Sequence, residues 1–397
     1  MPLVNRFADL LPEITAWRRD FHQHPELLFD VHRTAQIVAD KLREFGADEV
    51  VEGIGQTGVV AIINGKTASS GKASSDKVIG LSADMDALPI HETSGVPHAS
   101  ETDGKMHACG HDGHTAMLLG AAKYLCETRN FDGRVAVIFQ PAEEGGGGGE
   151  QMVNDGMMDR FGISEVYGMH NWPGLDVGKF AIRSGPLMAA ADQFDIVITG
   201  KGGHAAAPHR GIDATVIAAQ LTVALQSIVS RNVDPLENAV ISVTSFNTDT
   251  VSYNVIPQTV SMKGTVRTLS SEVRDGIKDR METLIEHTSK SLGGSATFDY
   301  HYGYPVTVNS DQQTGFATDI AKKVSGESSV NDDTAPVMGA EDFSYMLQAR
   351  PGAFIFMGNG DTALLHHPNY DFNDEAIPHG CSYWVHLVET AMPVNHA

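Results

Sequence analysis

Cysteine, histidine and small residues gather in one short segment that could bind a metal ion. The segment MHACGHDGHT places Cys109 and His111 on either side of Gly110. Thiolate and imidazole are ligands of a borderline-soft metal such as zinc, and carboxylates can complete such a site. The apolar run 116–125 that follows predicts a helix, with Asp112 as its N-cap. On its own the Cys-x-His spacing only suggests a metal site.

Two adjacent carboxylates, Glu143 and Glu144, come directly after a predicted strand and before the glycine run 145–149. Neighbours on extended backbone point to opposite sides, so one can bind a metal while the other faces a different space. A metal hydrolase needs that division, because a free carboxylate must take a proton from the attacking water. The alternative is a solvated acidic turn before a flexible loop.

His170 and the pair His366 and His367 are further candidates. Candidates recur at the ends of several predicted strands, namely Asp84, Asp86, Cys109, His111, Glu143, Glu144 and His170. The carboxyl ends of parallel strands meet at one edge of a sheet, where an open α/β fold keeps its site. These residues exceed the needs of one tetrahedral ion and predict a two-metal site.

The predicted elements that position these residues alternate between strands and helices. They are helices at 14–22, 34–45, 312–324 and 376–392, and strands at 58–63, 78–82, 134–139, 166–169 and 353–357. This alternation predicts an α/β domain with a central mixed, largely parallel sheet flanked by helices. The polar stretch 64–77 between two of the strands is predicted to be an exposed hairpin loop.

The pattern changes near Gly185. Strands at 194–199, 240–245, 260–268 and 296–302 and helices at 214–229 and 271–289 follow in the order βαββαβ. That order is typical of a ferredoxin-like unit, which folds compactly alone. We therefore expect residues 1–184 and 301–397 to form a catalytic metal-binding domain, and residues 185–300 an inserted α+β domain.

Composition narrows the class of partner. The formal net charge of −22 across 397 residues repels phosphate backbones and anionic membranes, so we expect neither a nucleic-acid nor a membrane partner. The N-terminal sequence does not resemble a secretory leader, and no run reaches eighteen or so consecutive apolar residues. Cys109, Cys126 and Cys381 do not form a disulfide framework, which favours the cytoplasm.

The motifs together resemble the zinc-peptidase-related amidohydrolases, which include aminoacylases and glutamate carboxypeptidases. The similarity is greatest to hippurate hydrolases, N-acyl-amino-acid amidohydrolases and plant auxin-conjugate hydrolases. The motifs are SADMDALP, MHACGHDGHTAMLLGAA, FQPAEEGGGG, MHNWP, GKGGHAAAPHRGIDA, YNVIPQ, GTVRT, MGAEDFSY and LHHPNYDFND, in the family's order along almost the whole chain.

This resemblance implies a role for each matching residue. The metal ligands would be Cys109, His111, Glu144, His170 and His366, with His366 chosen over His367. Glu143 would be the catalytic base and His204 would steady the carbonyl oxygen, while Asn254 and Arg267 would hold the amino-acid portion of the substrate. Asp86 would orient the site from behind the ligands.

The resemblance also implies two divalent ions per subunit, drawn from Zn, Mn, Co or Ni. The expected reaction is hydrolysis of an N-acyl amino acid, a small molecule, to a free amino acid and a carboxylic acid. The inserted domain would act as a lid and pair in a homodimer or homotetramer. Two alternatives stay open: a dipeptidase or carboxypeptidase of the same fold, and a catalytically silent metal- or ligand-binding module.

Overall fold

The computed structural model describes residues 3–66 and 76–394, and the chain divides into two compact units. The first unit consists of the described residues up to Gly185 together with 308–335 and 342–394. The second contains 186–307 and 336–341. The second unit therefore differs from the predicted range 185–300: it takes in 301–307 and the short segment 336–341, whose Val337 accepts the N–H of Ala189 at 3.1 Å.

The first unit is built on an eight-stranded mixed sheet with the order β1-β2-β4-β3-β5-β16-β6-β15. Its central strands β4, β3, β5 and β16 run parallel to one another. The strands are β1 (Glu49–Ile54), β2 (Gly58–Asn64), β3 (Val78–Asp84), β4 (Arg134–Gln140), β5 (Glu165–Pro173), β6 (Phe180–Ala181), β15 (Val330–Asn331) and β16 (Gly352–Gly360). The predicted α/β class with a largely parallel sheet is confirmed.

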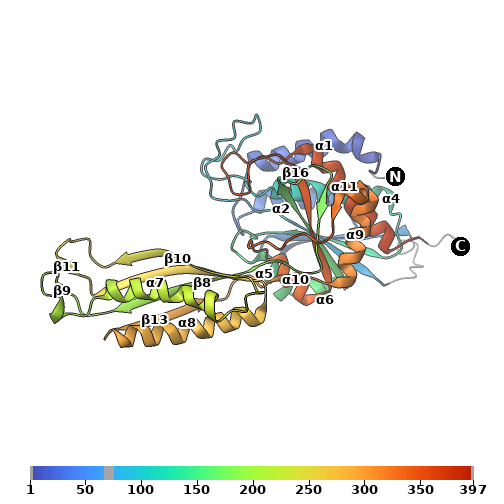
Figure 1. Ribbon diagram of the computed structural model, residues 1–397. Coiled ribbons are helices and arrows are strands. Elements are labelled where there is room, and N and C mark those ends of the chain that lie inside the picture. The colour runs from blue at the N-terminus through green and yellow to red at the C-terminus, as the bar shows by residue number, and fades with distance from the viewer. Residues whose placement is uncertain (1–2, 67–75, 395–397) are drawn as a thin grey trace. The chain divides into compact units, whose positions relative to one another are not determined.

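The central strands are buried on both faces, so helices must cover both (Figure 1). Alternate residues such as Ile79 and Leu81 point into one core shared with α1, α2, α4, α9 and α11. On the other face α5 packs against α10. The helices are α1 (Arg6–Gln23), α2 (His32–Phe45), α4 (His111–Thr128), α5 (Gly148–Asn154), α6 (Met157–Arg160), α9 (Asp311–Ser325), α10 (Phe343–Ala349) and α11 (Ile377–Ala391), with 3₁₀ turns at Glu327–Ser329 and Asp374–Ala376.

Two local predictions for the first unit are wrong. The hairpin expected across 64–77 does not form, because β4 lies between β2 and β3 and pairs with both. The loop residues 67–75 themselves lie outside the described residues. The N-cap position of α4 is Gly110, not Asp112. Asp112 lies inside the first turn and is buried against α1, where His22 contacts its carboxylate at 2.8 Å.

The second unit contains a four-stranded antiparallel sheet with the order β10-β12-β8-β13. Its elements follow one another as βαββαβ, which is the predicted ferredoxin-like order. They are β8 (Ala190–Thr199), α7 (Ala214–Arg231), β10 (Ala239–Thr248), β12 (Thr259–Thr268), α8 (Ser271–Ser291) and β13 (Ser295–His301). A small sheet pairs β9 (Gly203–His204) with β11 (Val255–Ile256), and a 3₁₀ turn spans Pro208–Arg210. Short strands β7 (Gly185–Met188) and β14 (Thr307–Asn309) lie where the chain passes between units.

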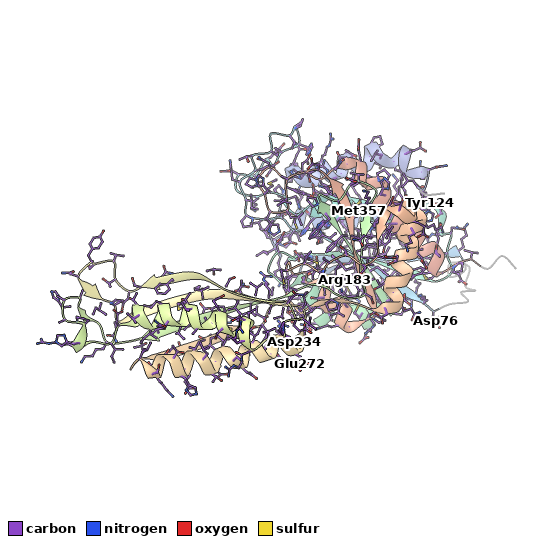
Figure 2. All side chains as sticks on the ribbon, viewed as in Figure 1. Asp76, Tyr124, Arg183, Asp234, Glu272 and Met357 are labelled. Carbon is purple, nitrogen blue, oxygen red and sulfur yellow. The ribbon has the colours of Figure 1, made fainter. Side chains whose placement is uncertain are left out.

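Each unit has its own hydrophobic core. Figure 2 draws the side chains and labels Met357, which lies on β16 of the first unit. In the second unit it labels Asp234, which follows α7, and Glu272, which lies in α8. Among the described residues, α7 alone is long and apolar enough by length and composition to cross a membrane. Its residues Ile217, Leu221 and Leu225 are buried in the core of the second unit, and a third of the helix is buried.

Candidate metal centre

The five predicted ligands are carried by four separate segments of the first unit. Cys109 and His111 stand at the start of α4, and Glu144 follows β4. His170 lies within β5, which continues past its predicted end, and His366 lies in the segment after β16. Because β4, β3, β5 and β16 are parallel neighbours, their carboxyl ends bring these segments to the same edge of the sheet.

Two of the histidines have their ring orientation fixed by the backbone. Nδ1 of His111 lies 2.8 Å from the carbonyl oxygen of Asp86, and Nδ1 of His170 lies 2.6 Å from that of Asn171. A carbonyl oxygen can only accept, so each Nδ1 carries the proton and each Nε2 is left with its lone pair. This arrangement orients an imidazole for metal binding.

The ligand atoms form two groups that share Cys109. One group is Cys109, His111 and His170, and the other is Cys109, Glu144 and His366; within each, the ligand atoms lie within 4.8 Å of one another. The Cys109 Sγ is 3.3 Å from Nε2 of His170, and Oε1 of Glu144 is 3.4 Å from Nε2 of His366. Cys109 would therefore take part in holding an ion in either group.

Two buried polar atoms that make no hydrogen bond support this interpretation. Among the described residues, Nε2 of His111 and Oε1 of Glu144 are buried and make no hydrogen bond. Burial and then the Glu144 carboxylate raise the pKa of Cys109, whereas burial and then His114 lower the pKa of His170 to about 3. His170 is therefore a neutral ligand, and an ion would displace the thiol proton. The donor set of sulfur, nitrogen and oxygen fits zinc or a similar divalent ion.

Asp86 holds the backbone that carries the two glutamates. Its Oδ1 accepts the N–H of Glu143 at 2.8 Å, and its Oδ2 accepts the N–H of Glu144 at 3.2 Å. The carboxylate of Glu143 is buried with Oε2 4.0 Å from Nε2 of His111. Glu143 is absent from the two groups that contain Cys109, but its carboxylate belongs to two other groups, one with His111 and Glu144 and one with Glu341 and Asp342.

Asn171, Tyr370 and His114 form a chain of polar contacts that reaches the backbone of Cys109. These contacts were not assigned from the sequence. Asn171 donates its side-chain N–H to the carbonyl oxygen of Cys109 at 2.6 Å and accepts the hydroxyl of Tyr370 at 2.7 Å. The backbone N–H of Asn171 donates to Nε2 of His114 at 2.9 Å, so Nδ1 of His114 donates to Asp84 at 2.6 Å. Asn171 and Tyr370 stand within the motifs MHNWP and LHHPNYDFND, and these motifs are the only sequence signal for them.

Asp84 also faces the centre. Its Oδ2 lies 3.3 Å from Nε2 of His111, the nitrogen that would bind a metal. Burial raises the pKa of Asp84, but electrostatic interaction with His111 and then with His114 outweighs burial and lowers the pKa below its usual range. Its position at a strand end made Asp84 a candidate site residue in the sequence, but it is not one of the five predicted ligands. The structure places its carboxylate against one of those ligands.

The backbone at the centre adopts left-handed conformations at three positions. Gly110 has φ +88°, Ala142 φ +55° and His366 φ +63°. A side chain at Gly110 would collide with Asn171 and the Tyr370 hydroxyl, so this turn requires glycine. For Ala142 and His366 the same conformation is strained, and such strain collects at functional sites.

His204 and Asn254 lie together in the second unit, on the small sheet of β9 and β11. His204 pairs with Val255, and Ala205 donates its N–H to the carbonyl oxygen of Asn254 at 2.9 Å. Both predicted residues are exposed. The N–H of Ala206 donates to Nδ1 of His204 at 3.1 Å, which leaves Nε2–H as the ring's hydrogen-bond donor.

Arg267 lies away from these two residues. It stands near the end of the ten-residue strand β12, whereas β11 comes just before the beginning of that strand. At about 3.3 Å per residue, β12 alone spans roughly 30 Å. Arg267 is half-buried, and burial lowers its pKa while Asp192 opposes this. The structure therefore brings His204 and Asn254 together and keeps Arg267 apart from them.

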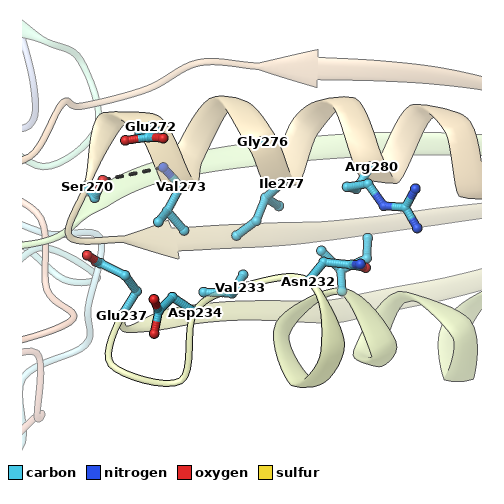
Figure 3. A pocket seen from close by; sticks show the side chains of 11 residues that line it. Asn232, Val233, Asp234, Glu237, Ser270, Glu272, Val273, Gly276, Ile277 and Arg280 are labelled. Carbon is cyan, nitrogen blue, oxygen red and sulfur yellow. Dashed lines mark hydrogen bonds between the residues drawn. The ribbon is translucent and has the colours of Figure 1, made fainter.

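A separate pocket of about 560 Å³ lies in the second unit, between the chain after α7 and the first turns of α8 (Figure 3). The apolar side chains of Val233 and Ile277 line it together with the acidic side chains of Asp234, Glu237 and Glu272. None of the predicted site residues lines this pocket. The candidate centre and this pocket are thus distinct features.

Residues 80–390 match the model of peptidase family M20/M25/M40. The match spans most of the chain and includes every segment that carries a predicted metal ligand. The chain belongs to this family. The predicted family is confirmed.

Within the M20 family the chain is similar to proteins along nearly its whole length. It is 40% identical over 387 residues to the hippurate hydrolase of Campylobacter jejuni, covering 98% of each chain. It is 44% identical over 371 residues to the N-acetyl-L-cysteine deacetylase of Bacillus subtilis, covering 93% of this chain and 86% of that one.

A crystal structure of an M20 protein shows the same fold. The YXEP protein of Bacillus subtilis, described as a dinuclear metal binding peptidase, superposes with a TM-score of 0.83 at 34% identity. The similarity covers 97% of this chain and 99% of that chain.

Proposed function

We propose that this protein is a metal-dependent amidohydrolase that cleaves N-acyl amino acids to a free amino acid and a carboxylic acid. The acyl group would be acetyl, benzoyl or similar, in keeping with the two amide-cleaving relatives. The observation that carries the proposal is the pair of ligand groups sharing Cys109, with the buried carboxylate of Glu143 4.0 Å from Nε2 of His111. Ligand groups without such a carboxylate would suit storage or sensing equally well.

Each ligand group has a distinct composition. Cys109, His111 and His170 supply sulfur and two nitrogens, whereas Cys109, Glu144 and His366 supply sulfur, oxygen and nitrogen. Both sets suit divalent Zn, Mn, Co or Ni, and we propose two ions per subunit. Ions bound there would polarise the scissile carbonyl and make a bound water a stronger acid.

Glu143 would perform the proton transfers. Its carboxylate accepts the proton of the attacking water and returns it to the leaving amine nitrogen as the C–N bond breaks. Asp86 fixes the position of Glu143 through the backbone N–H. Because His204 has Nε2–H as its donor, it is suited to stabilise the oxyanion of the tetrahedral intermediate.

We propose that Asn254 and Arg267 bind the amino-acid portion of the substrate, and that two copies of the chain cooperate. Arg267 lies near the end of β12, whereas His204 and Asn254 lie at the small sheet that comes before the beginning of that strand, so a separation far longer than an N-acyl amino acid lies between them. One substrate can therefore contact both only if they come from different chains. This supports a homodimer, or a homotetramer built from it, in which the inserted unit is both lid and interface.

We further propose that the enzyme works in the cytoplasm. Cys109, Cys126 and Cys381 are all free and buried. A metal-binding thiolate such as Cys109 is oxidisable, so a reducing compartment protects it.

A second candidate function is a dipeptidase or carboxypeptidase. The M20 family is described as a peptidase family, and so is the YXEP protein. The same centre would cleave a peptide bond by the same steps, because only the acyl side of the substrate differs. A silent binding module is the third possibility, which the buried carboxylate of Glu143 disfavours.

The test is release of free amino acid from N-acetyl and N-benzoyl amino acids and from dipeptides, by protein stripped with a chelator and reloaded with one known ion. We expect kcat/KM to be higher for the acyl amino acids, and activity to vanish without metal. Preference for dipeptides would establish the second candidate. Full activity after exhaustive metal removal would refute the metallohydrolase, and metal binding without any hydrolysis would favour the silent module.

A further inference from the structure

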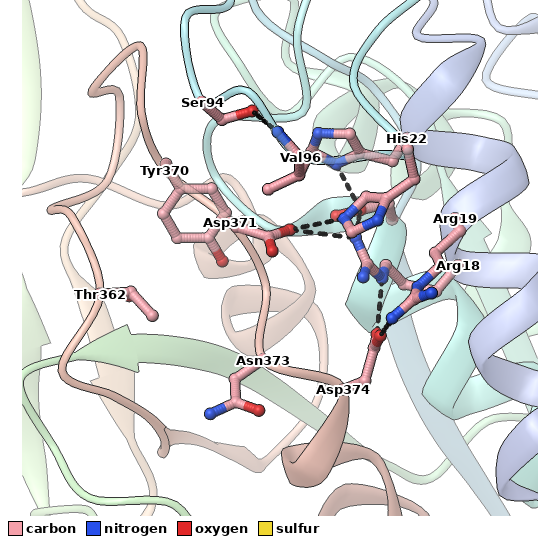
Figure 4. A network of polar contacts seen from close by, with 12 residues as sticks. Arg18, Arg19, His22, Ser94, Val96, Thr362, Tyr370, Asp371, Asn373 and Asp374 are labelled. Atoms are coloured by element: carbon pink, nitrogen blue, oxygen red, sulfur yellow. Dashed lines mark hydrogen bonds and ion pairs between the residues drawn. The ribbon is translucent and has the colours of Figure 1, made fainter.

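A buried ionic network joins α1 to the segments that carry two of the proposed ligands (Figure 4). Its centre is Arg18, whose side chain is completely buried. The guanidinium contacts Asp374 at 2.8 Å through Nε, and Asp371 at 3.2 Å and Asp112 at 3.5 Å through Nη1. These three carboxylates come from two parts of the chain that are distant in sequence from α1 and from each other.

His22, one turn further along α1, extends the network. Its Nδ1 lies 2.8 Å from Asp112 and its Nε2 lies 3.3 Å from Glu92. Both ring nitrogens therefore donate to carboxylates. Burial alone would lower the pKa of His22, but Asp112 and then Glu92 outweigh it and raise the pKa to about 9. The network thus contains two buried cations among its carboxylates.

Two of these carboxylates belong to chain segments that carry proposed metal ligands. The segment with Cys109 and His111 is here called the His111 segment, and the one that runs on from His366 is called the His366 segment. Asp112 follows His111 in the chain, and Asp371 lies in the segment that begins with His366. The two segments also meet at the backbone, where the N–H of His366 donates to the carbonyl oxygen of Ala108 at 2.8 Å. A single guanidinium nitrogen, Nη1 of Arg18, lies between Asp112 and Asp371 and so connects both segments.

The His366 segment needs such support more than the others. The side chain of His366 is 54% exposed, whereas those of His111 and Glu144 are at most 9% exposed. Its φ of +63° is strained for a residue other than glycine. Contacts elsewhere in its segment must therefore hold it in place.

We propose that Arg18 is a positioning residue that holds the His366 segment against the His111 segment, so that the second ligand group keeps its spacing. This inference rests on the proposed metal site. Lysine cannot replace arginine here, because a single ammonium lacks the planar fork that reaches three carboxylates at once. Removing the guanidinium would also leave Asp112 buried with less compensation.

The neighbouring residue offers a matched control. Arg19 contacts the same Asp374 at 2.8 and 3.0 Å, but from a half-exposed position. In the described part of the chain, the hydrogen bonds and the ion pair of its guanidinium go to Asp374. Arg18→Lys and Arg19→Lys therefore make the same chemical change one residue apart, and only the first disturbs the link between ligand segments.

The experiment is titration of the apoprotein with Co²⁺, followed by calorimetry and by the visible absorption of cobalt–thiolate and cobalt–imidazole centres. We expect the wild type and Arg19→Lys to bind two ions alike. Arg18→Lys should bind one ion normally and the other at least ~10-fold more weakly, the usual effect of losing a residue that orients ligands. Unchanged affinity for both ions would overturn the inference.

Thermal unfolding of each apoprotein separates positioning from simple destabilisation. Equal weakening of both ions together with a lower unfolding temperature would also overturn the inference, because a structural role does not discriminate between ions. If Arg18→Lys fails to fold, Asp371→Asn provides the test, since its partly exposed carboxylate links Arg18 to the His366 segment, and His98→Gln is its control because Nε2 of His98 contacts the same oxygen at 3.0 Å. Absence of cobalt binding by the wild type would refute the proposed metal site itself and not this positioning role alone.

Discussion

The carboxylate of Asp86 accepts the backbone N–H of Glu143 at 2.8 Å, while its backbone carbonyl accepts Nδ1–H of His111. One residue therefore fixes both the proposed base and a proposed ligand. Asp86→Asn should keep the contact between the backbone carbonyl and His111. It should impair the side-chain contact with the glutamates, because one amide N–H of the new side chain would face a backbone N–H of Glu143 or Glu144. We expect turnover to fall at least ~10-fold with near-normal metal content. Wild-type turnover in this variant would contradict the role.

The adjacent glutamates should separate cleanly by substitution. Glu143→Gln should leave metal content near normal and lower turnover at least ~100-fold, because general-base catalysis is lost. Glu144→Gln is the matched comparison and should lose metal, since Oε1 belongs to the second ligand group. Metal analysis beside steady-state kinetics measures both. If Glu143→Gln lost metal instead, the two roles would have to be exchanged.

Gly110→Ala should destabilise the protein and weaken metal binding. A methyl group there would collide with Asn171 and Tyr370, in addition to the cost of a left-handed alanine of about 1–2 kcal/mol. Gly104→Ala is the control, because Gly104 has a similar φ of +76° but open space around it. Urea unfolding should show a larger loss for Gly110→Ala. Equal losses would mean that the collision is relieved at no cost.

His22 should make stability depend on pH. Its pKa is raised to about 9 in the folded protein from an ordinary value of 6.5, so folding favours the protonated ring. The stabilisation is complete below pH 6.5 and is lost as the pH rises from 6.5 to 9. Below pH 6.5, His22→Gln should unfold at a lower temperature than the wild type. Between pH 6.5 and 9, its unfolding temperature should decline less than that of the wild type. If the unfolding temperatures of the two proteins changed with pH in parallel, a charged His22 ring would not be what stabilises the fold.

His204→Ala should lower turnover by roughly two to three orders of magnitude while metal content and fold survive, if it stabilises the oxyanion. Mixing this variant with Glu143→Gln under subunit exchange tests which chain supplies the histidine. Because the length of β12 lies between Arg267 and the small sheet that carries His204, we expect activity to recover. Failure to recover after proven exchange would place His204 in the same chain as the base. Unchanged turnover of His204→Ala would remove it from the mechanism.

The sequence alone determined most of the longer helices and strands and the types of residue at the strand ends. Helical and strand periodicity are local properties, so α4, the central parallel strands and the βαββαβ unit could be predicted from short windows. The family motifs are also contiguous, which is why the segments containing Cys109, Glu144 and His366 could be recognised from the order of residues alone.

Only the tertiary structure decided which of these segments meet. The insertion of β4 between β2 and β3 and the burial of Asp112 against His22 depend on pairings between residues far apart in the chain. Arg18 could not be assigned from sequence, because a buried guanidinium requires carboxylates that arrive from elsewhere. Local preference fixes the elements, whereas packing and charge compensation across the fold fix the site.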